Sequence, residues 1–584
     1  MPNLVLLAVV LAALNMLLLL PGFVFRHDAQ DVTPFFPRAH PHGAFGLDLR
    51  SIVEYPAALL LRRSNLDVFR VVVEWWAWCV LTLALARTRL AKPVRVVGAL
   101  AYVSLLFFLV YEHAFAWFFR REPVVTQDWV LLLNLWQFLV EMRVTGLLAG
   151  LAAVASLGAV TFAIARALRA LQELAPPLWR WALPVGLLWC LGSLAWFGVT
   201  RDDPVVQLVS KRVAWDLKRS RLESEKWAAA KRDVPDRRYD DFARIRLTRK
   251  PDVSMLVVEA YGEILATWDM TTAYRALMER VEARLAKRGL LAATITSAAP
   301  VHGGFSWFSL ATMQSGMLID RPESFTQVIQ AGVPTLSGFM AQQGYFTVAI
   351  QPGTSNKAGV GPRDWVGHSR FIGSEELAYS GKAWGFGRIP DQYALVELEK
   401  QLPGFASPRF IYSMSVSTHF PWGDHVPPYL ARDVLPTGVG PDLLHDETWA
   451  ELPGTRDIAE YRASYFKSVE YEFRVLTEFI ERDPSKDLLI IIVGDHQPRL
   501  ESNAPGEVTL NTPVHVLTTD PATLELFLKA GATKGMMPKP GATMAHEGLF
   551  SLIVWALAQA HGDAVSKVLG RWSPDGAQPS GLYR

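Results

Sequence analysis

Three residues with metal-binding side chains stand where apolar runs of the sequence stop. Glu259 ends the run VSMLVV, and the pair Asp495 and His496 ends the run LLIIIV. Carboxylates together with an imidazole form a typical site for a divalent cation. Because the donors would be mostly oxygens with a single imidazole, we expect manganese, with magnesium and zinc as alternatives. The sequence therefore predicts one divalent cation at this cluster.

Two further polar residues occupy comparable positions. His419 follows the run FIYSMSV, and Ser306 follows the turn HGGF, after which a helix is expected to begin. A hydroxyl at the beginning of a helix lies beside backbone N–H groups and the positive end of the helix dipole, which both stabilise phosphate. Each residue also has a structural explanation, since Ser306 could be a plain N-cap. Their shared placement favours a functional site.

The elements that must position these residues alternate between strands and helices from Asp252 onward. Short apolar runs predict buried strands at 253–258, 345–350, 410–416 and 488–493. Helices are predicted between them at 306–315, 334–343, 391–401, 458–481 and 544–559. Such alternation indicates an α/β domain with a mainly parallel central sheet covered on both faces. In such sheets the functional residues gather at the carboxyl ends of the strands.

The first 199 residues have a different composition, typical of a transmembrane bundle. A spanning helix needs about 20 mostly apolar residues. Five such segments are predicted, at 3–23, 70–87, 96–119, 144–167 and 179–199. Basic residues cluster after the second and fourth segments, which predicts that these two loops are cytoplasmic. The N-terminus would then be cytoplasmic and residues 200–584 would lie outside the cytoplasm.

Several segments near the predicted membrane surface remain open to two interpretations. Residues 121–143 are apolar but interrupted, which favours an amphipathic helix on the outer surface. The charge-rich segment 200–250 is either a juxtamembrane helix beside lipid headgroups or an ordinary solvated linker. Glu74, Glu112 and His113 stand near the outer ends of two spans, where they could contact headgroups or be merely interfacial. We predict three parts: a transmembrane domain 1–199, a linker 200–250 and a catalytic domain 251–584.

The overall composition excludes some classes of protein. Over 584 residues the net charge is only +2, which argues against a nucleic-acid-binding protein. The chain has two cysteines, Cys79 and Cys190, and both lie in apolar runs. We therefore expect neither a disulfide nor a zinc–thiolate site.

The same motifs resemble the alkaline phosphatase/sulfatase superfamily, and in particular its membrane-anchored branch of lipoteichoic acid synthases and phosphoglycerol or phosphoethanolamine transferases. VVEAYGE (257–263) is similar to the first metal-ligand strand, HGGFSWFSLATMQSG (302–316) to the nucleophile turn and helix, STHFPW (417–422) to the His-aromatic-Pro turn, and VGDHQP (493–498) to the Gly-Asp-His metal motif. The resemblance implies an alkaline-phosphatase-like fold. It also implies that Glu259, Ser306, Asp495 and His496 hold the cation.

The sequence departs from the branch in three respects. Ser306 stands where the branch usually has threonine, and Phe308 and Leu310 stand where a sulfatase needs proline and arginine to form formylglycine. The resemblance therefore does not imply sulfatase chemistry. Arg363 fits the arginine that grips the substrate phosphate, but the neighbouring tryptophan and histidine of the synthases have no clear match. The histidines available for a second metal, none in a convincing motif, are His302, His368, His425 and His546.

The resemblance implies a phosphotransferase in the bacterial cytoplasmic (inner) membrane, with its catalytic domain in the periplasm or outside the cell. Ser306 would be the nucleophile toward a membrane phospholipid donor, and Arg363 and His419 would bind the phosphoryl oxygens. His419 could instead protonate the leaving oxygen. The expected acceptor is a glycan or lipid of the cell envelope; the headgroup and the oligomeric state are left open. The alternatives are a membrane-anchored phosphoester hydrolase and a non-catalytic lipid-binding sensor.

Overall fold

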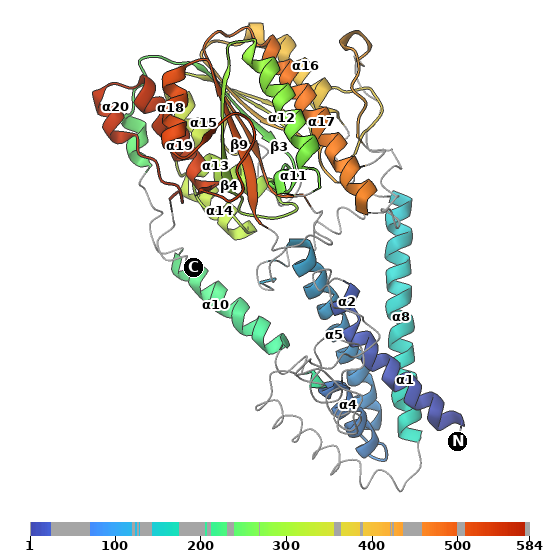
Figure 1. Cartoon of the computed structure of the whole chain (residues 1–584). Helices are drawn as coiled ribbons and strands as arrows, with labels where there is room; N and C mark the ends of the chain where they lie inside the picture. Colours follow the sequence, from blue (N-terminus) through green and yellow to red (C-terminus); the bar gives the residue numbers. More distant parts are fainter. Residues whose placement is uncertain are drawn as a thin grey trace, which may run out of the picture. The chain divides into compact units, whose positions relative to one another are not determined.

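The computed structural model describes most of the C-terminal part of the chain and the N-terminal part in segments. The described residues are 2–24, 71–119, 123–124, 128, 143–173, 205–206, 212–230, 239–267, 269–354, 364–385, 389–420, 422, 426–435, 458–498 and 509–577. The chain divides into two compact units, Met1–Ser224 and Glu225–Arg584 (Figure 1).

The first unit is helical. Its elements are α1 (Pro2–Leu19), α2 (Pro21–Val24), α4 (Val73–Ala84), α5 (Ala91–Phe119), α8 (Arg143–Glu173), the paired short strands β1 (Val71–Val72) and β2 (Val205–Val206), and the start of α10 (Ala214–Ala230). Apolar side chains of α1, α4, α5 and α8 form one buried cluster. Other apolar side chains of α5 and α8 are exposed, among them Leu100, Phe107, Val154 and Phe162.

Two helices within the described residues are long and apolar enough to cross a membrane, Ala91–Ala116 and Gly150–Glu173. The apolar stretches of α1 and α4, Leu6–Leu19 and Val73–Ala84, are shorter. The predicted span 179–199 and most of the predicted surface helix 121–143 lie outside the described residues. The predicted count of five spans is therefore not confirmed.

One predicted interfacial residue of this unit has a specific partner. The Glu112 carboxylate accepts hydrogen bonds from Nε of Arg212 at 2.6 and 2.7 Å. The Glu112 side chain is only 8% exposed, so the guanidinium compensates a carboxylate that is largely removed from water. The pair ties the end of α5 to the segment that enters α10.

The second unit contains a mixed, mostly parallel sheet, so the predicted α/β class of the catalytic domain is confirmed. Its strands are β3 (Asp252–Val258), β4 (Leu291–Ala298), β5 (Phe346–Ile350), β6 (Arg370–Ile372), β7 (Arg409–Met414), β8 (Leu488–Gly494), β9 (Asn511–Thr518), β10 (Thr533–Lys534) and β11 (Met544–Ala545). The order is β10-β4-β9-β8-β3-β7-β5-β6, with β11 beside β4. Strands β8, β3, β7, β5 and β6 are parallel, whereas β9 runs antiparallel to both β8 and β4.

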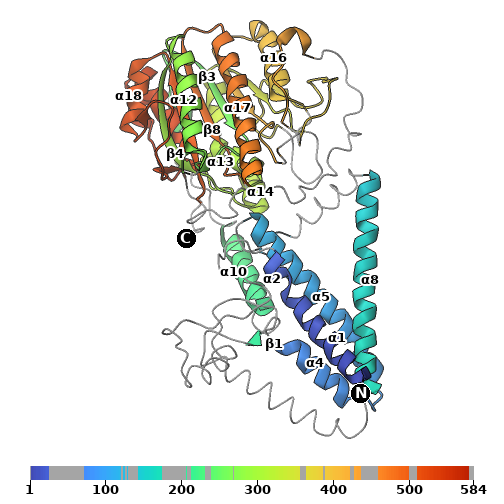
Figure 2. The same ribbon diagram turned by 45° about the vertical axis from the view of Figure 1, so that its right-hand side comes forward.

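Strand β3 shows why both faces of this sheet are covered. Side chains alternate between the faces of a strand. Met255 therefore packs into one apolar core with the helices α13, α15, α18 and α19, whereas Leu256 packs into a second core with α12, α16 and α17. Figures 1 and 2 show α12 and α17 side by side on the face of this second core.

The five predicted helices are present with similar bounds, apart from one correction, and α11, α12, α14, α18 and α20 are additional. The bounds are α11 (Ile264–Thr267), α12 (Thr271–Ala286), α13 (Ser306–Ser315), α14 (Pro322–Ala331), α15 (Leu336–Gln342), α16 (Asp391–Gln401), α17 (Ile458–Arg482), α18 (Pro521–Lys529), α19 (Glu547–His561) and α20 (Ala564–Leu569). The helix predicted at 544–559 begins only at Glu547, because Met544 and Ala545 pair as β11 with the end of β4.

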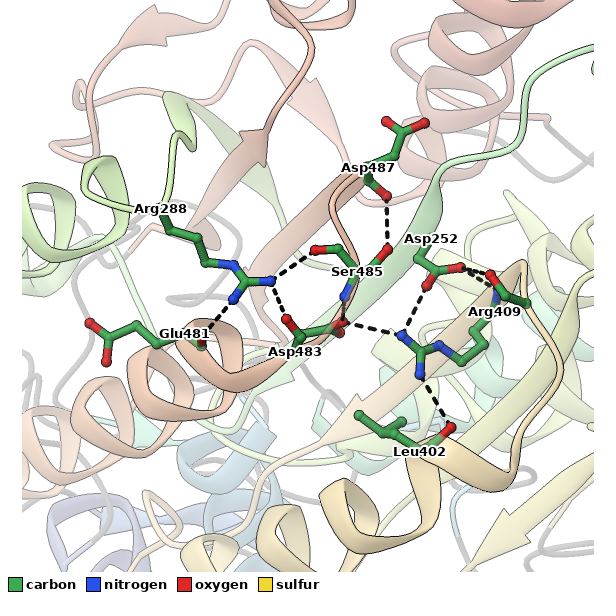
Figure 3. Close-up of polar contacts among 9 residues, drawn as sticks. Asp252, Arg288, Leu402, Arg409, Glu481, Asp483, Ser485 and Asp487 are labelled. Atoms are coloured by element: carbon green, nitrogen blue, oxygen red, sulfur yellow. Dashed lines mark hydrogen bonds and ion pairs between the residues drawn. The ribbon is translucent and has the colours of Figure 1, made fainter.

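A buried ionic network lies at the amino ends of the strands, opposite the predicted site (Figure 3). The Arg409 guanidinium contacts Asp252 at 2.9 Å and Asp483 at 3.2 Å, and all three side chains are nearly inaccessible to solvent. Arg288 donates to the carbonyl oxygens of Glu481, Asp483 and Ser485, which end α17. This network joins the starts of β3 and β7 to the end of α17.

Candidate active site

The candidate site is assembled at the carboxyl ends of two neighbouring parallel strands. Val258, the last residue of β3, pairs with Gly494, the last residue of β8. Glu259 and Asp495 therefore leave the sheet side by side, and His496 follows. The carboxylate and imidazole ligand atoms of these three residues all lie within 4.8 Å of one another, and all three side chains are buried.

Ser306 joins this cluster from the first turn of α13. Its hydroxyl donates a hydrogen bond to Oε2 of Glu259 at 2.8 Å and lies 3.3 Å from Nε2 of His496. The N-cap of the helix is Phe305, and no side chain caps it. Ser306 is therefore not a capping residue in this structure. The structure brings together the four residues predicted to hold a cation.

The local backbone holds these side chains through unusual conformations. Before Ser306, Gly303 and Phe305 have left-handed φ values of 63° and 59°, so the chain turns sharply into α13. After Glu259, Ala260 has a φ of 51°. Left-handed conformations of residues other than glycine are costly and often mark functional sites. The strained Ala260 places its N–H 2.7 Å from Oδ1 of Asp495, which links the turns that carry Glu259 and Asp495.

The donor atoms of the cluster fit a divalent cation. Oδ1 of Asp495 accepts hydrogen bonds from the N–H groups of Ala260 and His496, both at 2.7 Å. Its other oxygen, Oδ2, is buried and meets the criteria of a hydrogen bond with none of the described residues, although Nε2 of His496 lies 3.3 Å away. A buried carboxylate oxygen without a donor is costly. A cation beside Glu259, Ser306 and His496 would satisfy it.

The protonation equilibria of the cation-free cluster show the same need for positive charge. Burial, reinforced by the charge of Glu259, raises the pKa of Asp495 to about 7. Burial opposes the charged form of His496, but Asp495 and Glu259 outweigh it and raise the pKa of His496 to about 9. Burial likewise opposes ionisation of Glu259, yet His419 and His496 bring its pKa down to about 2. A divalent cation would replace the His496 proton.

His419 lies at the same edge of the sheet, in the loop after β7. Its Nδ1 hydrogen-bonds to the carbonyl oxygen of Phe420, and its charge acts on Glu259. The imidazole is half-buried, as is Ser306. His419 therefore lies close enough to the cluster for its charge to favour the ionised form of Glu259. Arg363, the predicted phosphate-binding residue, lies outside the described residues.

Two of the four histidines considered for a second metal make structural contacts. His368 bonds to Asp364 through Nδ1 at 2.5 Å and to Ser337 through Nε2 at 2.9 Å. Both ring nitrogens of His546 are engaged, and burial lowers its pKa to about 4. His302 is buried, and His425 lies outside the described residues. Within the described part of the chain, one group of carboxylates and imidazoles meets the geometry of a metal site.

Several residues that fix this site carry no signal in the sequence. Ser415 accepts a hydrogen bond from the Glu259 N–H at 3.1 Å, and Thr418 donates to the Glu259 carbonyl at 2.6 Å. Tyr465, in the middle of α17, donates to the carbonyl of the strained Ala260 at 2.7 Å. These contacts span more than 150 residues of sequence. Only the fold brings them to Glu259.

Comparisons with solved structures return proteins with related activities but low overall similarity. The soluble domain of lipooligosaccharide phosphoethanolamine transferase A from Neisseria meningitidis is 14% identical, covers 54% of this chain and 91% of its own, and has a TM-score of 0.37. The phosphoglycerol transferase GacH from Streptococcus pyogenes is 13% identical, covers 57% of this chain and 85% of its own, and has a TM-score of 0.33. The lipoteichoic acid synthase LtaP from Listeria monocytogenes is 15% identical, covers 49% of this chain and 71% of its own, and has a TM-score of 0.31. At these TM-scores the likenesses carry no functional argument.

No curated protein matches the sequence significantly. The model of the Sulfatase family, by contrast, matches residues 283–539. This range contains Ser306, His419, Asp495 and His496, whereas Glu259 precedes it. The predicted relationship to the alkaline phosphatase/sulfatase superfamily is therefore confirmed for residues 283–539, the part of the chain that matches the Sulfatase family model.

Proposed function

We propose that this protein is a metal-dependent phosphotransferase that moves a phospholipid headgroup phosphate, phosphoglycerol or phosphoethanolamine, to a cell-envelope acceptor through a phosphoserine at Ser306. One observation carries the proposal. The Ser306 hydroxyl lies 2.8 Å from Glu259 and 3.3 Å from His496, at the edge of a buried cluster whose Asp495 oxygen has no donor. A serine in this position suits nucleophilic attack rather than helix capping.

The residues that would hold the cation are Glu259, Ser306, Asp495 and His496. Manganese suits this set best, because the donors are mostly oxygens with one imidazole. A bound divalent cation would supply a lower pKa for the Ser306 hydroxyl and positive charge for the phosphoryl oxygens. The described residues offer one such group, which supports a single-cation site.

In the first step Ser306, whose hydroxyl proton has first been released to solvent, forms a bond from Oγ to the donor phosphorus, and the bond from phosphorus to the diacylglycerol oxygen breaks. The leaving oxygen takes a proton from His419, which is half-buried and close enough to Glu259 for its charge to act on that carboxylate. In the second step an acceptor hydroxyl gives its proton back to His419 and attacks the phosphoserine, which frees Ser306. Arg363 is proposed to offset charge on the phosphoryl oxygens.

We also propose that this catalytic domain, 251–584, is anchored by residues 1–199 in the bacterial inner membrane and works in the periplasm or outside the cell. The exposed apolar side chains on the long helices α5 and α8 support a lipid environment. An anchored enzyme suits a reaction whose donor and diacylglycerol product both remain in the bilayer. Residues 200–250 would then form the juxtamembrane linker.

The test is to incubate the full-length protein, purified in detergent, with manganese and headgroup-labelled phosphatidylglycerol or phosphatidylethanolamine. Release of diacylglycerol reports turnover, and the fate of the label names the acceptor. Transfer to an added glycan or glycolipid supports the transferase. Release of free glycerol phosphate or phosphoethanolamine at the full rate of diacylglycerol release, with acceptors present, would make the protein a hydrolase.

A further inference from the structure

A pair of buried acidic side chains lies behind the loop that carries His419. Asp391 is the first residue of α16, and Glu472 lies in the middle of α17, which packs against α16 (Figure 1). Their exposed fractions are 2% and 0%. Acids this deeply buried are rare unless they are paired or bonded. Neither belongs to the cluster of Glu259, Asp495 and His496.

The Asp391 carboxylate is bonded to the backbone that precedes His419. It accepts hydrogen bonds from Val416 N–H, at 2.9 Å to the nearer oxygen, and from Ser417 N–H at 2.6 Å. In return Ser417 Oγ accepts from the Asp391 N–H at 3.1 Å. The start of α16 and the residues 416–417 are thus joined by side-chain and backbone bonds in both directions.

The same short loop is bonded to the candidate metal site on its other side. Ser415 and Thr418 bind the N–H and carbonyl groups of Glu259. Within the same loop, the His419 N–H donates a hydrogen bond to the Val416 carbonyl oxygen at 3.0 Å, which closes the turn. The turn from Ser415 to His419 is therefore held between Glu259 and Asp391. Its geometry fixes where the His419 imidazole stands relative to the cluster.

Charge distributes unequally between the two acids. Asp391 accepts N–H bonds that stabilise its ionised form, whereas the carboxyl oxygens of Glu472 are buried without a hydrogen-bond donor among the described residues. Burial and the charge of Asp391 raise the pKa of Glu472 well above its usual value. Burial raises the pKa of Asp391 as well, but the N–H groups of Val416 and Ser417 oppose that rise. Asp391 is therefore the member of the pair better able to carry the negative charge, and Glu472 the one better able to hold the proton.

We propose that Asp391 is a positioning residue for His419, and that Glu472 acts behind it as a neutral acid. The carboxylate of Asp391 sets the turn 415–419 so that the imidazole meets the oxygen that leaves phosphorus. This inference rests on the proposed function of His419. It assigns no contact with substrate to either acid.

The chain offers a matched control for a buried aspartate at the other end of the sheet. Asp483 is also buried, accepts a backbone hydrogen bond from Ser485 at 2.8 Å and contacts Arg409 (Figure 3). It lies at the amino ends of the strands, where it touches neither the turn 415–419 nor the cluster. Loss of Asp483 should affect stability without affecting His419.

The experiment is a double-mutant cycle in the full-length protein, with diacylglycerol release from the phospholipid donor as the readout. Asp391→Asn should lower kcat by about ten- to a hundredfold, the scale expected for a misplaced catalytic group, with KM and manganese affinity unchanged. His419→Ala should lower kcat at least as much. The double variant should be no slower than His419→Ala, because both changes remove the same contribution. Glu472→Gln should keep kcat, since it still offers a neutral donor to Asp391.

The outcomes separate the inference from the proposed function. If the effects of Asp391→Asn and His419→Ala multiply, or if Asp483→Asn lowers kcat as much as Asp391→Asn, the positioning role is overturned. If His419→Ala leaves kcat intact, the proposed role of His419 itself is wrong. A p-nitrophenyl phosphodiester provides a second test, because its leaving group needs no proton. Asp391→Asn should slow this ester much less than the lipid donor, and equal slowing would indicate general disruption of the domain.

Discussion

The carbonyl oxygen of Tyr261 occupies the space where a side chain at Gly494 would begin. An ideal Cβ built on Gly494 would lie 1.8 Å from that oxygen, far inside contact distance. Tyr261 follows the turn after Glu259, and Gly494 directly precedes Asp495. The absence of a side chain at this one position therefore allows the two metal-binding turns to approach each other.

A first prediction follows for Gly494→Ala. The added methyl group must push the Glu259 turn away from the Asp495 turn, because the obstacle is backbone and cannot rotate away. We expect a strong loss of manganese affinity and a clear fall in Tm, measured by calorimetry on the full-length protein. Gly404→Ala is the control, since a Cβ there meets nothing within 4 Å. Equal manganese affinity in both variants would show that the close approach is dispensable.

The second prediction concerns the number of cations and the role of Asp495. Asparagine can still accept the hydrogen bonds from Ala260 and His496, but it removes the charge of the unsatisfied oxygen. Asp495→Asn should therefore fold and lose manganese affinity by more than about 100-fold, the upper range for residues that only orient a ligand. Metal analysis of the unmodified protein should give one ion per chain. Two ions, or undiminished binding by the variant, would contradict the assignment.

A third prediction concerns the pH dependence of stability. Burial and Asp391 raise the pKa of Glu472 far above its usual 4.5. The folded state therefore holds a proton that the unfolded state releases above about pH 4.5. The contribution of protonated Glu472 to the free energy of unfolding is fully present below that pH. It declines as the pH rises toward the pKa of Glu472 in the folded protein. Glutamine stays neutral at every pH, so the Tm of Glu472→Gln should rise relative to the unmodified protein between pH 5 and pH 8, with manganese saturating.

This comparison isolates Glu472, because the other titrating groups are common to both proteins. Two groups act on Glu472: Asp391 across the helix interface, and Tyr471, its neighbour in the sequence. Burial and the charges of the two acids raise the pKa of Tyr471. A Tm difference that stays constant from pH 5 to pH 8 would mean that Glu472 is not the proton-holding member of the pair.

The topology gives a fourth prediction. Basic residues in the loops after the second and fourth predicted spans predict that those loops are cytoplasmic. An alkaline phosphatase reporter fused after the C-terminus should be active, and one fused near Arg89 should be inactive. The opposite pattern would contradict the proposed extracytoplasmic location of the catalytic domain.

The strands that carry the site could be predicted because they are continuous apolar runs. β3, β5, β7 and β8 were each indicated by such a run, and the glycine-rich turn marked the start of α13. β4 and β9 gave no such signal, because they contain buried polar residues. Thr294 of β4 and His515 of β9 hydrogen-bond each other at 2.8 Å, which lets polar residues lie inside the sheet. Only the paired structure explains that burial.

Some residues of the candidate site could likewise be predicted from the sequence, and others could not. Glu259, Ser306, Asp495 and His496 could be proposed together because strand ends and glycine turns are visible in the sequence. Asp391 could not, since an aspartate at the start of a helix usually indicates no more than a favourable charge at its N-terminus. Its bonds to Val416 and Ser417 depend on how α16 packs beside the end of β7. The sequence contains the residues but not this proximity.

The central claim is that Ser306 becomes covalently phosphorylated, and trapping that species tests it most directly. The full-length protein is mixed with manganese and labelled phospholipid, quenched in acid, digested and analysed by mass spectrometry. We predict a headgroup-phosphate adduct on the peptide containing Ser306, and its absence in Ser306→Ala together with a loss of activity of several orders of magnitude. Ser306→Thr should retain part of the activity. An adduct on another residue, or a Ser306→Ala protein that keeps its rate and loses only the ~1 kcal/mol of a helix cap, would contradict the account.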